Sequence, residues 1–243
     1  MLVTRPEPGG RRTALRLAEM GHEPVRLPLF EPRITAQAAD LPEAGPIDAL
    51  VATSARAFDF LRGAPIPRPY RRIPIHAVGP ATAHSASEAG FATIQEAGGT
   101  ALELARSLIA NSSAGGEGQP ARLLYLAGRP RKSSLEAELG RAGMSVTTLE
   151  TYEMIEISYS TDFIMDDVFD PAPDVILLYS ANAADRLVQL LSDKNRGKSL
   201  RSARFLCLSS DIRDRLPDPW RARATASARP EEDSLLASLA ALG

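Results

Sequence analysis

The sequence predicts an α/β fold made of two similar, doubly wound parallel-sheet lobes. Short apolar runs rich in Val, Ile and Leu alternate with helical patterns along the 243 residues, which is typical of strand–helix–strand units in parallel sheets. Every helical run is short, which argues against a helix bundle. The chain also exceeds the usual single-domain length, and one of its segments recurs later in the sequence. Two lobes of the same kind are therefore expected.

The first half of the chain predicts strands and helices in alternation. Residues 1–4 are expected to form a strand, and residues 7–21 a turn and a helix that ends at Gly21. A strand interrupted by proline follows at 22–32, and another at 48–54. The remaining predicted elements of this half are a helix at 54–63, a strand at 73–79, a helix at 80–90 and a helix at 100–111.

The second half repeats the alternation after a polar, glycine-rich loop at 112–120. A strand at 121–128, a helix at 133–143 and a long strand at 144–157 are expected first. The remaining predicted elements are a strand at 174–180, a helix at 181–193, a strand at 203–209, a helix at 211–216 and a helix at 230–242.

An internal repeat relates the two halves. The segment DALVATSARAFDFL (48–61) shares Asp, Ser, Ala, Asp and Leu positions with DVILLYSANAADRL (174–187). Residues 10–31 resemble residues 132–153, and residues 77–86 resemble residues 207–216 more weakly. The pattern allows two arrangements: a lobe inserted between the two ends of the chain, with connecting strands near 29–34 and 151–157, or two lobes in tandem.

Composition excludes several classes of protein. The chain is 44% hydrophobic and 24% charged with a formal net charge of −2, as expected of a globular protein and without the clustered basic excess of a nucleic-acid binder. No leader-like segment or apolar run of roughly 20 residues is present, so no membrane association is expected. The single cysteine, Cys207, lies in an apolar run and favours a reducing, cytoplasmic location. The three histidines share no metal-ligand spacing, so no metal is expected.

Candidate binding residues lie where predicted strands give way to helices. Ser54 and Ser180 each follow an apolar strand and precede a helix. A serine there caps the helix, and the same position is where open α/β sheets bind ligands. The turn from Gly79 to Thr82, with Pro80 in the first helical turn, offers similar free amides.

Charged and phenolic side chains add to these candidates. Arg5, Arg56 and Arg129 are natural partners for carboxylates, or else ordinary surface charges. The Tyr152 phenol on a predicted connecting strand is a candidate hydrogen-bond donor or weak acid, or else a packing residue. No dinucleotide fingerprint, P-loop or nucleophile elbow is present, which argues against nucleotide-dependent transfer and serine hydrolysis.

A set of short motifs occurs in the order found in one enzyme family. The motifs are VTRP at 3–6, TSARA at 53–57, VGPATA at 78–83, LAGRPR at 126–131, TLETYE at 148–153 and YSANAA at 179–184. In this order they resemble the uroporphyrinogen-III synthase family over essentially the whole chain.

The resemblance implies a particular organisation and activity. It implies two α/β lobes of the HemD type joined by a two-stranded β connector: lobe 1 from residues 1–32 and 158–243, lobe 2 from residues 35–151, and connector strands at 29–34 and 151–157. It implies a lyase that cyclises linear hydroxymethylbilane, with loss of water and inversion of the last ring (ring D), to uroporphyrinogen III. No cofactor is implied. A monomer that receives its substrate from hydroxymethylbilane synthase is expected.

The resemblance also implies roles for individual residues. Tyr152 matches the family tyrosine proposed to assist hydroxyl departure. The matching substrate-binding positions are Arg5, Ser54, Arg56, Gly79, Pro80, Ala81, Thr82, Gly128, Arg129, Ser180, Asn182 and Ser209. Where relatives often carry a Gly-x-x-Thr-Ala turn in the other lobe, this chain has Ser209 and Ile212, so Ser209 and Ser210 are expected to replace the missing hydroxyl. The alternative hypothesis is a two-lobed tetrapyrrole-binding protein without activity.

Overall fold

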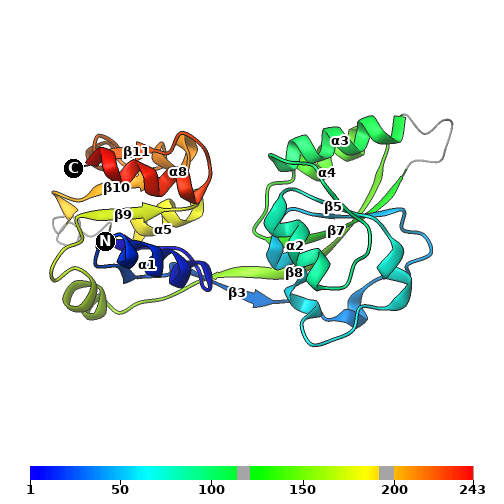
Figure 1. The fold of residues 1–243 in the computed structure, drawn as a ribbon, viewed down its shortest axis with the longest axis horizontal. Helices are drawn as coiled ribbons and strands as arrows, with labels where there is room; N and C mark the ends of the chain where they lie inside the picture. Colours follow the sequence, from blue (N-terminus) through cyan, green and yellow to red (C-terminus); the bar gives the residue numbers. More distant parts are fainter. Residues whose placement is uncertain (114–120, 192–199, 243) are drawn as a thin grey trace. The chain divides into compact units, whose positions relative to one another are not determined.

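The computed structural model describes residues 1–113, 121–191 and 200–242 (Figure 1). The chain divides into two compact units. Unit 1 consists of Met1–Glu31 and Ile155–Gly243, and unit 2 consists of Pro32–Met154. Most of the loop predicted at 112–120 and the end of the helix predicted at 181–193 lie outside the described residues.

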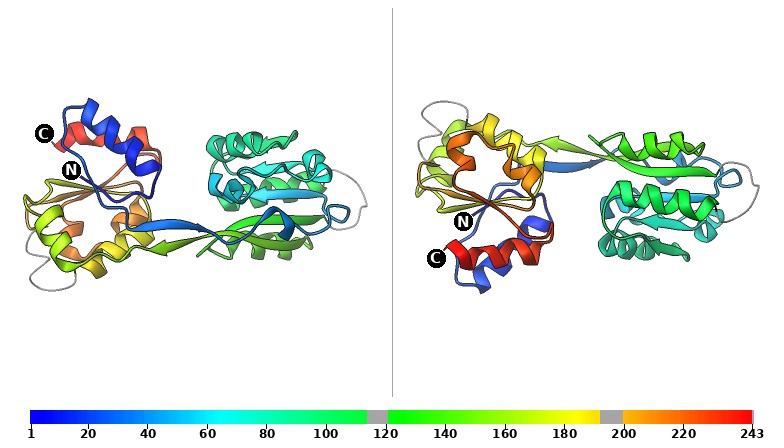
Figure 2. Two further views of the ribbon diagram at one scale, coloured as in Figure 1. Left: turned by 90° about the horizontal axis from the view of Figure 1, so that it is seen from below. Right: turned by 90° about the horizontal axis from the view of Figure 1, so that it is seen from above.

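Unit 1 is built on a five-stranded parallel sheet. Its strand order is β11 (Ala224–Ala226), β10 (Arg204–Cys207), β9 (Val175–Leu178), β1 (Leu2–Val3) and β2 (Val25–Arg26). Helices α1 (Gly9–Glu19) and α8 (Glu232–Ala237) cover one face, and a 3₁₀ turn (Ser238–Leu242) follows α8 (Figure 2). The other face is covered by α5 (Ala181–Leu190), α6 (Ser210–Arg213), α7 (Asp218–Arg221) and a π-helical turn at Phe163–Val168.

Unit 2 contains most of a six-stranded sheet. The order is β3 (Phe30–Ile34), β8 (Ser145–Glu156), β7 (Arg122–Arg129), β4 (Ala49–Ala52), β5 (Ile75–Ala77) and β6 (Ile94–Glu96). Helices α3 (Ala101–Ser113) and α4 (Ser134–Arg141) cover one face. The 3₁₀ helix η2 (Ala55–Leu61) and α2 (Pro80–Glu88) cover the other, and short 3₁₀ turns lie at Ala38–Asp40 and Arg68–Arg72.

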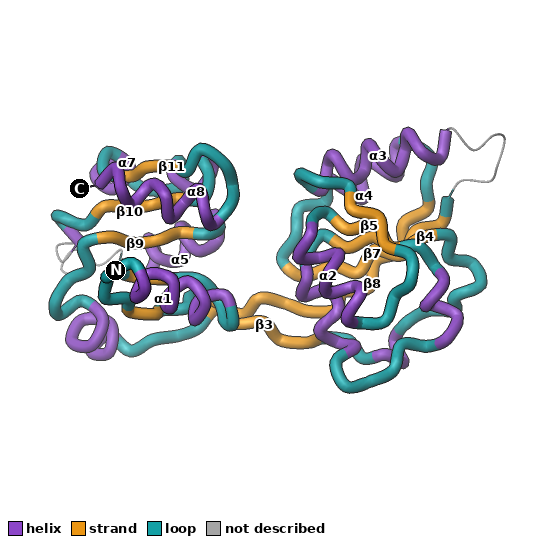
Figure 3. Tube along the Cα trace, viewed as in Figure 1, coloured by secondary structure: helices purple, strands orange, loops and turns teal. Residues whose placement is uncertain are grey.

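The chain passes between the units on β3 and β8. Hydrogen bonds flank this strand pair, from the Thr35 amide to the Thr151 carbonyl and from the Ile157 amide to the Leu29 carbonyl, both 3.0 Å long. The two segments run antiparallel, since residues early in one pair with residues late in the other. The tube in Figure 3 shows these two strands as the connection.

The sequence repeat corresponds to a repeat of topology. The order β11-β10-β9-β1-β2 in unit 1 matches the order β6-β5-β4-β7-β8 in unit 2. The three repeated segment pairs fall on equivalent elements: β4–η2 with β9–α5, α4–β8 with α1–β2, and β5–α2 with β10–α6. Both units are thus doubly wound sheets of the 2-1-3-4-5 type. In unit 2 the first parallel strand along the chain is the central one, β4.

Burial on both faces explains why the central strands are continuously apolar. All four residues of β4 and of β9 are buried, as expected for parallel strands between two helical layers. The edge strands β6 and β11 have three residues each and are largely accessible, so they have no clear hydrophobic pattern and were not predicted. The helix predicted at 54–63 is a 3₁₀ helix.

Among the described residues, no helix is both long and apolar enough for a membrane span.

Candidate functional site

The predicted binding residues gather at the carboxyl ends of the central strands in each unit. In each sheet the winding direction changes between two adjacent strands, β1 and β9 in unit 1 and β7 and β4 in unit 2. Ligands of open α/β sheets bind outside the carboxyl ends at this switch point. Arg5 and Ser180 follow β1 and β9, and Arg129 and Ser54 lie at the equivalent ends of β7 and β4. Each unit therefore carries its own cluster of candidates.

Two of the three candidate serines cap helices with their side chains. Ser54 Oγ accepts from the Arg56 amide at 3.3 Å, and Ser180 Oγ accepts from the Ala183 amide at 3.1 Å. Ser209 has the same extended backbone before α6 but makes no side-chain cap. Asn182, in the first turn of α5, is exposed. The hydroxyls of Ser54 and Ser180 thus stabilise helix starts and also lie at the expected ligand edge.

The turn at the start of α2 exposes backbone. Gly79 is extended at the N-cap, Pro80 begins the helix, and the Thr82 amide donates to the Gly79 carbonyl at 3.0 Å. Ala81 is exposed, and by its position in the first turn its amide has no intrahelical acceptor. Thr82 is 6% exposed, and Ile212 at the equivalent place in α6 is 5% exposed.

Arg5 binds a carboxylate of its own unit. Its guanidinium contacts Glu232 Oε1 at 3.0 Å and lies 4.9 Å from the centre of the Tyr179 ring. The Thr13 hydroxyl donates to the same Glu232 oxygen, and the Tyr179 hydroxyl lies 3.2 Å from it. Burial opposes ionisation of Glu232, but Thr13, Arg5 and Tyr179 outweigh it and lower the pKa of this carboxyl. Burial raises the pKa of Tyr179 to about 12.

Arg129 belongs to a chain of alternating charges around β8. Glu153 accepts from Arg129 at 2.5 Å, and Glu150 contacts Arg129 at 3.3 Å. Glu150 also contacts Arg131 at 2.7 Å, and this hydrogen bond lowers the pKa of the Glu150 carboxyl. Two further members extend the chain: Arg33 of β3 pairs with Glu153, and Glu136 of α4 pairs with Arg131.

Tyr152 lies on β8 against the end of β7. Its side chain is half-buried, and it is paired in register with Gly128. Close by, the hydroxyl oxygens of Tyr125 and Thr53 are 2.9 Å apart. Burial raises the pKa of the Tyr125 phenol, the Thr53 hydrogen bond opposes the rise, and Glu136 and Tyr152 add to it. The structure therefore brings Gly128, Tyr152, Tyr125 and Thr53 together.

The sequence interpretation missed Thr53 and Tyr125. Thr53 directly precedes Ser54, just as Tyr179 directly precedes Ser180 in the repeat. In both units this preceding residue makes hydrogen bonds to another element, Thr53 to β7 and Tyr179 to α1 and α8. The repeated position before the serine was the available signal.

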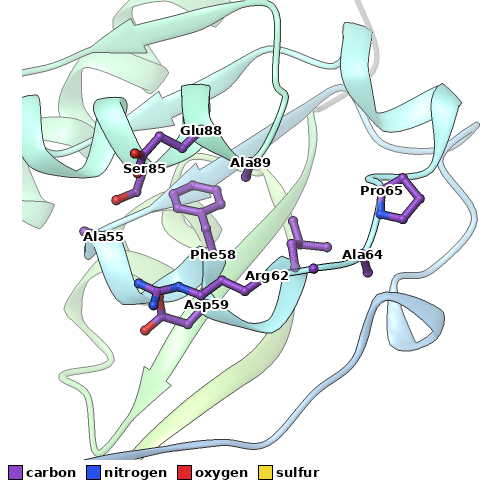
Figure 4. Close-up of a pocket in the computed structure, with 11 residues that line it drawn as sticks. Ala55, Phe58, Asp59, Arg62, Ala64, Pro65, Ser85, Glu88 and Ala89 are labelled. Carbon is purple, nitrogen blue, oxygen red and sulfur yellow. The ribbon is translucent and has the colours of Figure 1, made fainter.

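A surface pocket of about 250 Å³ lies between η2 and α2 (Figure 4). Phe58 lies between the two elements, with Asp59 and Arg62 on one side and Ser85 and Glu88 on the other. Asp59 pairs with Arg62 at 2.9 Å, and Glu88 lies 3.5 Å from His84. The charges of Asp59 and Arg62 therefore compensate each other within unit 2, and none of the predicted site residues lines this pocket.

Within residues 1–113, 121–191 and 200–242, no group of three or more His, Cys, Asp and Glu side chains is arranged to hold a metal ion.

Arg56 is also a predicted substrate ligand. Its guanidinium lies 4.0 Å from the carboxylate of Asp59.

A family model described as "Uroporphyrinogen-III synthase HemD" matches residues 11–237. The chain belongs to the uroporphyrinogen-III synthase family. This assignment confirms the resemblance inferred from the ordered motifs, and it makes the chain a member of a family of cyclising lyases of porphyrin biosynthesis.

Two solved structures of family members share the fold. Uroporphyrinogen-III synthetase from Helicobacter pylori superposes with a TM-score of 0.65 at 15% identity, covering 90% of this chain and 92% of that one. A mutant uroporphyrinogen III synthase from Thermus thermophilus gives a TM-score of 0.55 at 17% identity, covering 99% and 98%. Among curated proteins, no sequence matches. The predicted fold class is confirmed by these likenesses.

Proposed function

We propose that this chain cyclises hydroxymethylbilane to uroporphyrinogen III, with inversion of the last ring and loss of water. The observation that carries the proposal is the family match over residues 11–237. The same match does not favour the alternative of a binding protein without activity.

The reaction needs an acid and a template rather than a metal or redox group. The nitrogen lone pair of the terminal pyrrole pushes out the hydroxyl, which takes up a proton and leaves as water. For inversion, the substituted α-carbon of the last ring attacks the resulting azafulvene. The bond from this carbon to the rest of the chain then breaks and re-forms at the free α-carbon of the same ring, which loses its proton as the macrocycle is completed. A protein can accelerate this by protonating the leaving group and by fixing which carbon attacks.

We assign the acid role to Tyr152. A phenol hydroxyl is a hydrogen-bond donor and a weak acid. Support comes from the place of this side chain, which is half-buried on β8 beside the carboxyl end of β7. The Tyr125 and Thr53 hydroxyls nearby keep the surroundings polar.

We assign substrate binding to the strand ends of both units. The substrate carries carboxylate side chains on every ring, and helix N-termini attract anions through their free amides. The starts of η2, α2, α5 and α6 supply such amides at Ser54, Ala81, Ser180 and Ser209. Arg129 has the most exposed side chain of the three predicted arginines, which makes it the one best suited to add a charge-assisted bond in exchange for one of its present partners. Dispersed amides of this kind allow a protein of net charge −2 to hold a polyanion.

The isomer of the product tests the proposed function. Purified protein is supplied with hydroxymethylbilane generated in situ, and the oxidised product is separated into type I and type III isomers. The type III isomer is expected, because the enzyme directs inversion of the last ring, whereas spontaneous closure yields type I. Type I alone at every enzyme concentration would reject the proposal.

Replacing Tyr152 by Phe tests the acid role. Loss of a general acid is expected to lower kcat by about 10²-fold. The free energy of unfolding is expected to change by less than about 1 kcal/mol, because the ring and its packing remain. Steady-state kinetics and urea unfolding check the two parts. A parent-like kcat would show that water or another group protonates the hydroxyl.

We further propose that the protein works in the cytoplasm as a monomer and receives its substrate from hydroxymethylbilane synthase. The buried single cysteine supports a location where no disulfide is needed, and burial raises the pKa of Cys207 to about 12, which leaves the thiol unreactive.

A further inference from the structure

We propose that Gly128 is a positioning residue for Tyr152: the missing side chain of Gly128 leaves the space in which the phenol ring lies. The inference deepens the proposed function and rests on it only where catalysis is concerned. It changes the role of Gly128, which the sequence suggested as a substrate ligand.

A β-bulge places the tyrosine opposite this glycine. Along β7 and β8 the pairing runs from Arg122 with Ser145 to Ala127 with Glu150, and then shifts so that Gly128 pairs with Tyr152. One residue of β8, Thr151, has no counterpart in β7. A bulge of this kind bends the strand and re-aims the following side chain.

The bulge is held on both sides. Thr151 is completely buried, and its hydroxyl donates to the Ala127 carbonyl at 3.3 Å. Its carbonyl accepts from the Thr35 amide at 3.0 Å. The Thr35 hydroxyl donates to the Glu150 carbonyl at 2.8 Å. The residue before Tyr152 is therefore attached to both neighbouring segments, and its backbone has little freedom to shift.

The ring of Tyr152 occupies the place of a side chain at Gly128. A Cβ atom built on Gly128 would overlap Tyr152 Cζ, and it would lie 2.5 Å from the hydroxyl oxygen and 2.7 Å from Cε1 of the same ring. These distances are far inside van der Waals contact. Gly128 does not have the positive φ found at Gly63, Gly90 and Gly143, so its backbone conformation is open to other residues. The close approach of the phenol is what excludes a side chain at this position.

An alanine at 128 should move the phenol rather than unfold the unit. The atoms that it meets are at the far end of a side chain with two rotatable bonds. Rotation about these bonds relieves the overlap and carries the hydroxyl away from its place. Because a misplacement of about 1 Å at a reacting group can cost about 10²-fold in rate, the loss should fall on kcat.

A structural measurement tests the placement without reference to activity. The five tyrosines of the chain are labelled with 3-fluorotyrosine, and their ¹⁹F resonances are assigned with single Tyr→Phe variants. Gly128→Ala is expected to shift the Tyr152 resonance most. The control is Gly140→Ala on α4, where an added Cβ meets nothing within 4 Å, and it should leave all five resonances in place. An unmoved Tyr152 resonance in Gly128→Ala overturns the inference even if the parent is an active synthase.

A kinetic cycle then tests the consequence for catalysis. Gly128→Ala is expected to lower kcat by about 10²-fold with KM within about threefold, whereas Gly140→Ala keeps the parent kcat. In a Tyr152→Phe background the hydroxyl is already gone, so adding Gly128→Ala should lower kcat by less than about threefold. Independent, multiplying losses would show that Gly128 acts through substrate or fold, and would overturn the positioning role.

The two experiments separate the inference from the proposed function. Type I product alone from the parent rejects the synthase, while the ¹⁹F result still decides where the ring lies. A normal isomer assay together with parent-like kcat in Gly128→Ala rejects the positioning role and leaves the synthase standing.

Discussion

At the scale of single residues, partners decide what a charged side chain does. Arg5 was expected to bind substrate carboxylates, and the structure shows it bound to Glu232, stacked on Tyr179 and near Thr13. This network joins α1, β9 and the start of α8, that is, both ends of the chain within unit 1. The immediate partner of Arg5 is therefore a carboxylate that holds unit 1 together, and substrate binding by Arg5 stays a prediction.

Glu232→Gln is expected to destabilise unit 1 in a pH-dependent way. The pKa of Glu232 is lowered in the folded state, so its contribution is present above the unfolded pKa, about 4.3, and is lost as the pH falls through the folded value. Loss of its charged hydrogen bonds should cost about 1.5–3 kcal/mol at pH 7. The difference from the parent should shrink progressively below about pH 4.

The fluorescence of the single tryptophan can be used to measure the free energy of unfolding of unit 1. Trp220 is 8% exposed in the core of unit 1, so its fluorescence during urea unfolding follows this unit. Glu19→Gln, at an exposed position of α1, is the control and should change the free energy of unfolding by less than about 0.5 kcal/mol. An equal loss at pH 7 and at about pH 3.5 in Glu232→Gln would contradict the ionic contribution.

At the scale of elements, three serines that each lie between a parallel strand and a helix behave differently. Ser54 and Ser180 cap the helices that follow, while Ser209 does not. The helix that follows Ser180 has ten residues, and the helix that follows Ser209 has four. The same residue type at the end of a parallel strand thus caps a helix in two places and makes no side-chain cap in a third.

Ser180→Ala is therefore expected to lower the free energy of unfolding of unit 1 by about 1 kcal/mol, since it removes the cap to the Ala183 amide. Ser209→Ala, the matched control, should cost less than about 0.5 kcal/mol. Trp220 fluorescence in urea follows both variants. Equal losses of unfolding free energy in the two variants would show that the cap hydrogen bond of Ser180 adds no stability to unit 1.

At the scale of the whole molecule, the chain builds one topology twice but in two ways. Unit 2 is continuous, whereas unit 1 takes β1 and β2 from the start of the chain and β9, β10 and β11 from its end. In unit 1, β1 lies between β9 and β2 in the sheet, and Leu2 and Val3 are completely buried. The two ends must therefore meet before unit 1 has a complete core.

This difference predicts how fragments behave. Residues 32–154, expressed alone, should fold. This range contains both helical layers of unit 2 and its five parallel strands, apart from the last residues of β8. Residues 155–243 alone should not fold, because the strand next to β9 is missing, and addition of residues 1–31 in trans should restore structure. Dispersion of amide resonances in NMR spectra decides each case. A well-dispersed spectrum for 155–243 alone would contradict the argument.

The amino-acid sequence by itself determined the fold class, because strands buried on both faces and helices packed on one face impose hydrophobic periodicities that are local in the chain. The internal repeat and the family also followed from the sequence, because both are written in short segments whose order can be read along the chain. The sequence also located Ser54, Ser180 and the turn at Gly79, since caps and turns depend on neighbouring residues. Only the tertiary structure decided that Arg5 binds Glu232, that Thr53 meets Tyr125, and that Gly128 makes room for Tyr152. Each of these contacts either joins residues far apart in the sequence or depends on a one-residue shift in strand pairing. Contacts of these two kinds leave no local pattern in the sequence.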